Sequence, residues 1–123
     1  MLNAIIVGAG GFVGSVLRYL VGIGVNRLTG HHFFPVATLT VNVVGCFVIG
    51  ALGGYMLTRD LLGDQARLFV MVGVLGGFTT FSTFGNETVH LVKSSQPGPA
   101  LLYVVLHLVL GLGAAWWGHH LVK

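Results

Sequence analysis

Charged side chains are scarce in this sequence. Lys, Arg, Asp and Glu make up 7% of the 123 residues, whereas soluble domains contain about 25%. This scarcity excludes an ordinary water-soluble domain. Six basic residues against three acidic ones leave a net charge of +3, but these residues are scattered singly along the chain. Since a nucleic-acid interface needs a basic patch, we expect no nucleic-acid partner.

Cysteine and metal-binding patterns are also sparse. Cys46 is the only cysteine, so it cannot form an internal disulfide, and we expect it to be a small buried apolar residue. Four of the six histidines form the adjacent pairs His31–His32 and His119–His120, which do not have the i, i+4 spacing of metal ligands on a helix. No nucleophile–base arrangement is recognisable, so we expect no enzyme.

The N-terminal region contains two patterns that could suggest a signal peptide or a dinucleotide-binding loop, and neither is complete. Positive charge is missing before the first apolar run, so we do not expect a cleaved signal peptide. The motif "GAGGFVG" at Gly8–Gly14 is similar to a dinucleotide-binding loop, but its third glycine is misplaced and no βαβ pattern follows. We expect Gly10 and Gly14 to form a helix contact instead.

Apolar residues and glycine are abundant: 54% of the chain is hydrophobic and 20 residues are glycine. Four apolar stretches reach the length of about 20 residues that a membrane-spanning helix needs. They are Leu2–Val25, Val36–Leu57, Leu68–Val92 and Ala100–Val122. The connections are short, so consecutive helices are expected to be antiparallel neighbours. The sequence therefore predicts an all-α membrane protein with a single four-helix transmembrane domain over residues 1–123.

The basic residues give no preferred orientation in the membrane. One side of the predicted bundle carries Arg59, Arg67 and Lys123. The opposite side carries Arg18, Arg27 and Lys93. Because an excess of Lys and Arg on one side sets orientation, an equal distribution predicts insertion both ways, unless other insertion signals decide. No internal repeat is visible, so an inverted repeat would require a second copy of the chain.

The third span contains "LGGFTTFSTFGNE" (Leu75–Glu87), which is unusual for a lipid-spanning helix. Gly76 and Gly77 weaken a helix there, and four hydroxyl residues follow within five positions. We predict that the third helix is broken at mid-membrane, near Thr80. Backbone freed in this way must be buried in protein or line a wet cavity, where it commonly binds an ion. The alternative is close helix packing by Gly73 and Gly77, which have GxxxG spacing.

Aromatic and amide side chains make an anion the favoured ligand. Phe81 and Phe84 share a helix face, and the positive edges of their rings can flank an anion. Asn42, with Thr40 nearby, lies ~6 Å from the centre of its span and can donate hydrogen bonds. The alternative is that Asn42 connects helices structurally.

Two charged residues within the spans allow several roles. Arg18 and Glu87 could pair with each other, or extend toward the membrane surface. Arg18 could also attract anions into a vestibule. No other acidic residue occupies the core of a span, which argues against a proton-coupled carrier.

Three blocks of sequence together carry a family resemblance. They are "GGFVGSVLRY" (Gly10–Tyr19), "TLTVNVVGCFVIG" (Thr38–Gly50) and "GVLGGFTTFSTFGNE" (Gly73–Glu87). With them the chain resembles the Fluc (CrcB-like) fluoride channels over essentially its whole length. The resemblance implies an antiparallel, dual-topology homodimer with two fluoride pores. It also implies a central structural Na⁺ that is not transported, held by backbone carbonyls of Gly76 and Thr79 from each subunit.

The resemblance also implies roles for individual side chains. Phe81 and Phe84 would be pore phenylalanines, and Asn42 the pore amide. The polar pore lining would include Ser82, Thr83, Thr40 and Tyr103. The chain departs from its relatives at four positions, Cys46, Gly85, His107 and Gly111. His107 and Gly111 stand where relatives often have hydroxyls, so His107 could supply a pH-dependent donor instead.

The expected function is passive export of fluoride across a bacterial plasma (inner) membrane, which lowers fluoride toxicity in the cytoplasm. The expected partners are a second copy of the chain, fluoride and membrane lipid. One alternative is a small multidrug exporter of dual topology, but those carriers need an acidic residue in the first helix, where this chain has none. The other is a nonconducting scaffold subunit.

Overall fold

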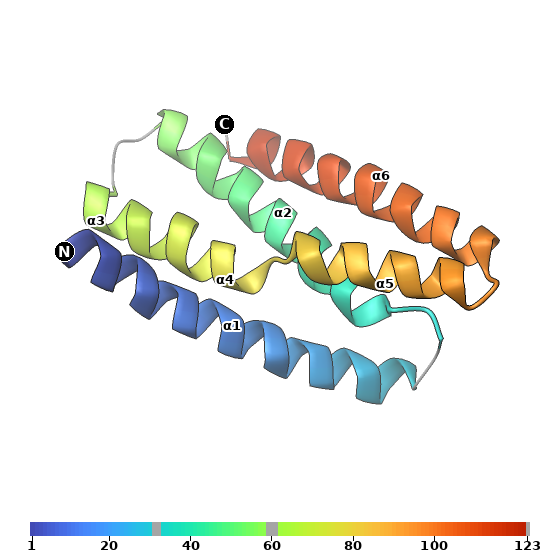
Figure 1. Cartoon of the computed structure of the whole chain (residues 1–123). Helices are drawn as coiled ribbons and strands as arrows, with labels where there is room; N and C mark the ends of the chain where they lie inside the picture. The colour runs from blue at the N-terminus through green and yellow to red at the C-terminus, as the bar shows by residue number, and fades with distance from the viewer. Residues whose placement is uncertain (31–32, 59–61, 123) are drawn as a thin grey trace.

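The computed structural model describes residues 1–30, 33–58 and 62–122, and the described residues contain helices and no strands (Figure 1). Three long helices are α1 (Leu2–Thr29), α2 (Val36–Thr58) and α6 (Pro97–Leu121). The third span runs from Asp64 to Lys93 in four segments. These are α3 (Asp64–Arg67), the π-helix η1 (Leu68–Leu75), α4 (Gly76–Phe78) and α5 (Phe81–Lys93).

Four helical spans in the described residues are long and apolar enough to cross a membrane. This confirms the predicted all-helical class and number of spans, and three of the helices extend beyond the apolar stretches read from the sequence. The third begins at Asp64, four residues before Leu68. The first helix continues past Val25 to Thr29, and it stops at Gly30, whose positive φ of 74° suits glycine. The fourth helix begins at Pro97 instead of Ala100, because the first helical turn needs no donor from the proline nitrogen.

Neighbouring spans are antiparallel (Figure 1). The N-terminus, the end of α6 and the connection between α2 and α3 lie at one end of the bundle, and the other two connections lie at the opposite end. The predicted positive charges of Arg59 and Lys123 fall outside the described residues. Helix α6 packs mainly on α2, and α1 packs mainly on η1 and α4.

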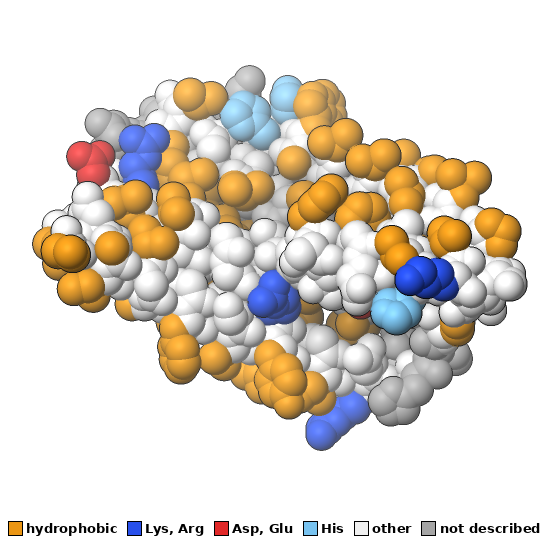
Figure 2. All heavy atoms as spheres, viewed as in Figure 1, with side chains coloured by type: hydrophobic (Ala, Val, Ile, Leu, Met, Phe, Trp, Pro, Cys, Tyr) orange, Lys and Arg blue, Asp and Glu red, His pale blue; other side chains and the backbone are white. Residues whose placement is uncertain are grey.

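Hydrophobic side chains cover much of the outer surface, with few charged groups between them (Figure 2). Exposed examples from three spans are Phe12, Val72 and Leu112. Few large side chains are buried inside the single chain, and Tyr103 and Val41 are the largest fully buried ones among the described residues. Such a surface suits contact with lipid or with another apolar surface better than contact with water.

Glycines allow α1 to lie directly against the third span. A Cβ added at Gly10 would lie 2.9 Å from the Cα of Gly73, and one added at Gly14 would lie 2.8 Å from the backbone nitrogen of Phe78. Added Cβ atoms at both positions would also collide with backbone carbonyls of the third span, including that of Val74. The predicted helix contact of Gly10 and Gly14 is therefore confirmed, and Gly73 takes part in it.

Gly14→Ala is expected to lower the free energy of unfolding by about 2–3 kcal/mol, because the new methyl group collides with backbone that cannot move aside. Thermal unfolding in detergent would measure the effect. Gly8→Ala is the matched control, since a Cβ at Gly8 has no neighbour within 4 Å. Equal melting temperatures for the two variants would contradict the close packing.

Candidate functional site

Thr79 and Thr80 separate α4 from α5 and have extended backbone conformations. Thr79 has ψ 157°, and Thr80 has φ −152° and ψ 116°. The Oγ1 atom of Thr80 accepts a hydrogen bond from the backbone N–H of Thr83 at 3.2 Å, so Thr80 caps the N-terminus of α5. A hydroxyl residue at this position therefore helps α5 to begin at Phe81.

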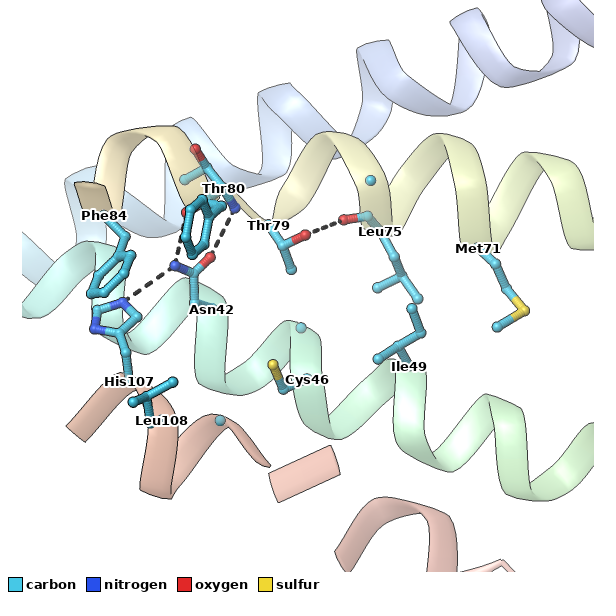
Figure 3. A pocket seen from close by; sticks show the side chains of 14 residues that line it. Asn42, Cys46, Ile49, Met71, Leu75, Thr79, Thr80, Phe84, His107 and Leu108 are labelled. Atoms are coloured by element: carbon cyan, nitrogen blue, oxygen red, sulfur yellow. Dashed lines mark hydrogen bonds between the residues drawn. The ribbon is translucent and has the colours of Figure 1, made fainter. Parts of the chain in front are cut away.

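Asn42 of α2 holds both backbone groups of Thr80. Its Oδ1 accepts the Thr80 N–H at 2.8 Å, and its Nδ2 donates to the Thr80 carbonyl at 3.0 Å (Figure 3). In a continuous α-helix, the Thr80 N–H would bond to the carbonyl of Gly76. The Asn42 side chain thus supplies the partners that the extended backbone would otherwise lack, which is the structural connection considered as its alternative role.

Aromatic side chains form a cluster beside Asn42. The ring of Phe84 lies 5.5 Å from the ring of Tyr103 and 4.3 Å from that of His107. Phe81 lies 5.5 Å from Phe84, as their spacing predicts, but Phe81 is 83% exposed. Phe84 therefore packs inside the chain, whereas Phe81 extends from its surface.

A cavity of about 390 Å³ opens next to the non-helical segment (Figure 3). Its lining includes five of the predicted site residues, Asn42, Gly76, Thr79, Phe81 and Phe84. The remaining lining residues are mostly apolar, with His107 and Cys46 added. The fold thus gathers amide, aromatic and backbone groups from α2 and the third span around one space.

Comparison with known proteins identifies the family. Residues 5–119 match the family described as CrcB-like protein, Camphor Resistance (CrcB). The chain belongs to the CrcB-like family. This confirms the resemblance seen in the three sequence blocks.

Several curated relatives are each named fluoride-specific ion channel FluC. The protein of Elusimicrobium minutum is 50% identical over 96% of this chain and 91% of its own length. That of Flavobacterium psychrophilum is 40% identical over 93% and 91%, and that of Nitrobacter winogradskyi is 43% identical over 95% and 92%. With its four apolar helices, this CrcB-like chain is a multi-pass membrane protein.

Glu87 of this CrcB-like protein binds two hydroxyl groups. The Tyr103 hydroxyl donates to its Oε2 at 2.6 Å, and the Thr38 hydroxyl donates to its Oε1 at 2.9 Å. Tyr103 is fully buried. Hydroxyl donors offset part of the cost of placing a carboxylate in apolar surroundings. Thr38 was not among the predicted site residues, and nothing in the sequence pattern links it to Glu87.

Arg18 hydrogen-bonds to the non-helical segment. Its Nη1 lies 3.4 Å from the carbonyl oxygen of Thr79 and donates to it. Arg18 and Glu87 also line a second cavity of about 570 Å³, together with Thr83 and residues of α1 and α2. The two charged residues thus share one space, but each hydrogen-bonds to a different partner.

The predicted hydroxyl residues lie in different surroundings. Ser82 and Thr83 are exposed, and their hydroxyls lie 3.3 Å and 3.0 Å from the Thr80 Oγ1. The Thr40 hydroxyl donates to the carbonyl of Val36 in its own helix at 2.9 Å. Ser82 and Thr83 are therefore available near the start of α5, whereas Thr40 already uses its hydroxyl proton.

The backbone carbonyls of Gly76 and Thr79 can be tested against the sodium ion that the family resemblance implies. The Thr79 carbonyl accepts a hydrogen bond from Arg18, so it has one lone pair left for a cation. The Thr80 N–H, which would bond to the Gly76 carbonyl in a helix, is donated to Asn42 instead. Gly76 and Thr79 line the same cavity, and carbonyls of unwound backbone are suitable ligands for Na⁺ in membrane proteins. The resemblance implies that a second copy of the chain supplies the same two carbonyls.

Proposed function

We propose that this protein is a fluoride-selective channel through which F⁻ leaves the cell passively. The single observation that carries the proposal is the cavity where Asn42, Phe81 and Phe84 meet non-helical backbone. The names of the relatives, at 39–50% identity over nearly the full chain, support the same function. The chain is not an enzyme, since its family consists of ion channels.

The channel is an antiparallel homodimer of two oppositely inserted copies. The balanced distribution of Lys and Arg allows both insertions. Extended backbone at mid-membrane needs a protein or water environment, which a partner can provide. Gly76 is exposed, and a Cβ added there would have no neighbour within 4 Å. This face is therefore open enough to receive the second copy.

Fluoride conduction requires donors that replace water without binding the ion too tightly. Arg18 raises the local anion concentration in the second cavity, which serves as the vestibule. Ring edges of Phe81 and Phe84 accompany the ion past the cluster. The exposed hydroxyls of Ser82 and Thr83 donate hydrogen bonds to the ion directly. Asn42, Thr40 and Tyr103 also belong to the proposed polar lining, but each must first give up the hydrogen bond that it donates within the chain. Acidic surroundings favour HF, which crosses lipid and dissociates inside, and the inside-negative bacterial inner membrane drives F⁻ out.

Reconstituted liposomes test this function against the two alternatives. Fluoride efflux without chloride efflux, measured with ion-selective electrodes, is the result expected of the channel. Proton-coupled uptake of a cationic drug would instead identify a multidrug exporter. Protein that inserts and dimerises but passes none of these solutes would be a scaffold subunit. Protein-free liposomes give the background leak of HF.

Removing sodium is expected to weaken the channel. A structural Na⁺ held by the Gly76 and Thr79 carbonyls of both copies joins the subunits at their centre, so exchange of Na⁺ for N-methylglucamine should lower flux and the dimer fraction. Fluoride efflux and size-exclusion chromatography would be measured in parallel, with K⁺ as a control for ionic strength. Unchanged flux and assembly in N-methylglucamine would contradict the sodium site.

A further inference from the structure

His107 of α6 has a proton position fixed by its neighbours. Its Nδ1 lies 3.0 Å from the carbonyl oxygen of Tyr103. A carbonyl can only accept a hydrogen bond, so Nδ1 carries the proton in the neutral imidazole. Nε2 is then an acceptor, and it faces the Nδ2 of Asn42 at 3.3 Å (Figure 3).

With neutral His107, the amide of Asn42 has no donor left for a ligand. One Nδ2 proton goes to the Thr80 carbonyl, and the other goes to His107 Nε2. Its Oδ1 is occupied by the Thr80 N–H. An amide has two N–H donors, so an anion that approaches Asn42 must displace one of these partners.

A proton on His107 Nε2 reverses this arrangement. Nε2 then becomes a donor and faces the donor Nδ2 of Asn42, with 3.3 Å between the nitrogens. Two facing donors repel each other and move apart, and a small anion that enters from the cavity can then accept from both. Phe84 packs on the imidazole with ring centroids 4.3 Å apart and an interplanar angle of 37°. Both His107 and Asn42 line the 390 Å³ cavity from which an anion can enter.

We propose that Asn42 and His107 form a proton-linked binding site for a small monovalent anion, which is closed when His107 is neutral and takes fluoride when His107 is protonated. The inference rests on the proposed fluoride conduction and adds regulation by pH to it. Because binding linkage is reciprocal, fluoride binds more tightly at low pH, and bound fluoride increases proton uptake by His107.

Other titratable groups near His107 come from its own helix and from the two helices packed against α6. Tyr103 is on α6, with its ring 4.4 Å from that of His107. Cys46 of α2 shares the cavity with His107. Glu87 of α5 hydrogen-bonds to Tyr103 and is the acidic side chain of this group. Imidazole is the group among these that ordinarily titrates between pH 5 and 8.

Fluoride titration of the purified protein in detergent tests the site without HF leakage across lipid. Sodium fluoride would be titrated at about pH 8 and about pH 5 and followed by fluorine NMR. We expect affinity to be about fivefold or more higher at the lower pH, within the usual range of coupling between sites. His107→Gln should have the same affinity at both pH values. His90→Gln, at an exposed position on α5, should keep the difference.

Proton uptake provides a second measurement that does not depend on a variant. Fluoride added to the wild-type protein in weak buffer at about pH 6 should cause proton uptake, and His107→Gln should show none. Equal affinity at both pH values, no proton uptake, or pH dependence that persists in His107→Gln would each overturn the proton-linked site. If the protein conducts fluoride in liposomes but its affinity for fluoride does not depend on pH, only this inference fails. If the protein conducts no fluoride at either pH, the proposed function fails, and so does the inference that rests on it.

Discussion

Aspartate in place of Asn42 is expected to abolish fluoride flux and to lower the free energy of unfolding by about 3 kcal/mol or more. The two side chains have nearly the same shape, so packing is unchanged. The substitution replaces the Nδ2 donor by a carboxylate oxygen that lies close to the Thr80 carbonyl and, while His107 is neutral, to a second acceptor, His107 Nε2. Loss of two hydrogen bonds and repulsion between buried acceptors add to the cost of burying the charge.

Protonation of the new side chain would not restore the arrangement. A carboxylic acid has one O–H donor, whereas the amide of Asn42 donates to two acceptors. When the aspartate is ionised, its negative charge in the anion path repels fluoride. Flux therefore falls in either protonation state.

The measurement combines fluoride efflux from liposomes with thermal unfolding in detergent. Asn3→Asp is the matched control, because Asn3 is exposed in the first turn of α1, where a negative charge is favourable. The control should conduct and unfold like the wild type. Substantial flux through Asn42→Asp would show that neither the Thr80 connection nor the amide donors are needed.

The lengths of the apolar stretches were enough to predict the four spans, because a helix crosses the bilayer when it has about 20 consecutive apolar residues. The helix ends were less predictable. Residues beyond Val25 are polar enough to leave the lipid, but polarity does not end a helix, and α1 continues to the positive φ at Gly30. The start of α6 depends likewise on Pro97, which occupies a first turn without cost.

The site was only partly predictable because its decisive contacts join distant parts of the chain. The glycines and hydroxyls near Thr80 indicated weak helix locally. The partner of Thr80 is Asn42, 38 positions away, and no local pattern specifies that pairing. An ion pair between Arg18 and Glu87 was one of the roles expected from the sequence. In the structure, Arg18 donates to the Thr79 carbonyl instead. Glu87 accepts hydrogen bonds from Tyr103 and Thr38, which are 16 and 49 positions away in the sequence, and no local sequence pattern predicts either contact.

Phe81→Ile is expected to reduce fluoride flux at least about tenfold, which corresponds to about 1.4 kcal/mol in the barrier. Isoleucine keeps an apolar side chain but has no aromatic ring with a positive edge for the anion. Phe81 is 83% exposed and packs 5.5 Å from Phe84, so the loss of its ring leaves the buried aromatic cluster of Phe84 and Tyr103 in place. The effect should therefore appear in flux more than in stability.

Fluoride efflux from liposomes would be compared with the dimer fraction from size-exclusion chromatography. Phe12→Ile is the matched control, since Phe12 is also an exposed phenylalanine but lies on α1, outside both cavities. A dimeric Phe81→Ile protein with reduced flux assigns the ring to conduction, because assembly and folding are then intact. Normal flux through this variant would remove Phe81 from the pore, and loss of the dimer would assign the exposed ring to the interface between the two copies.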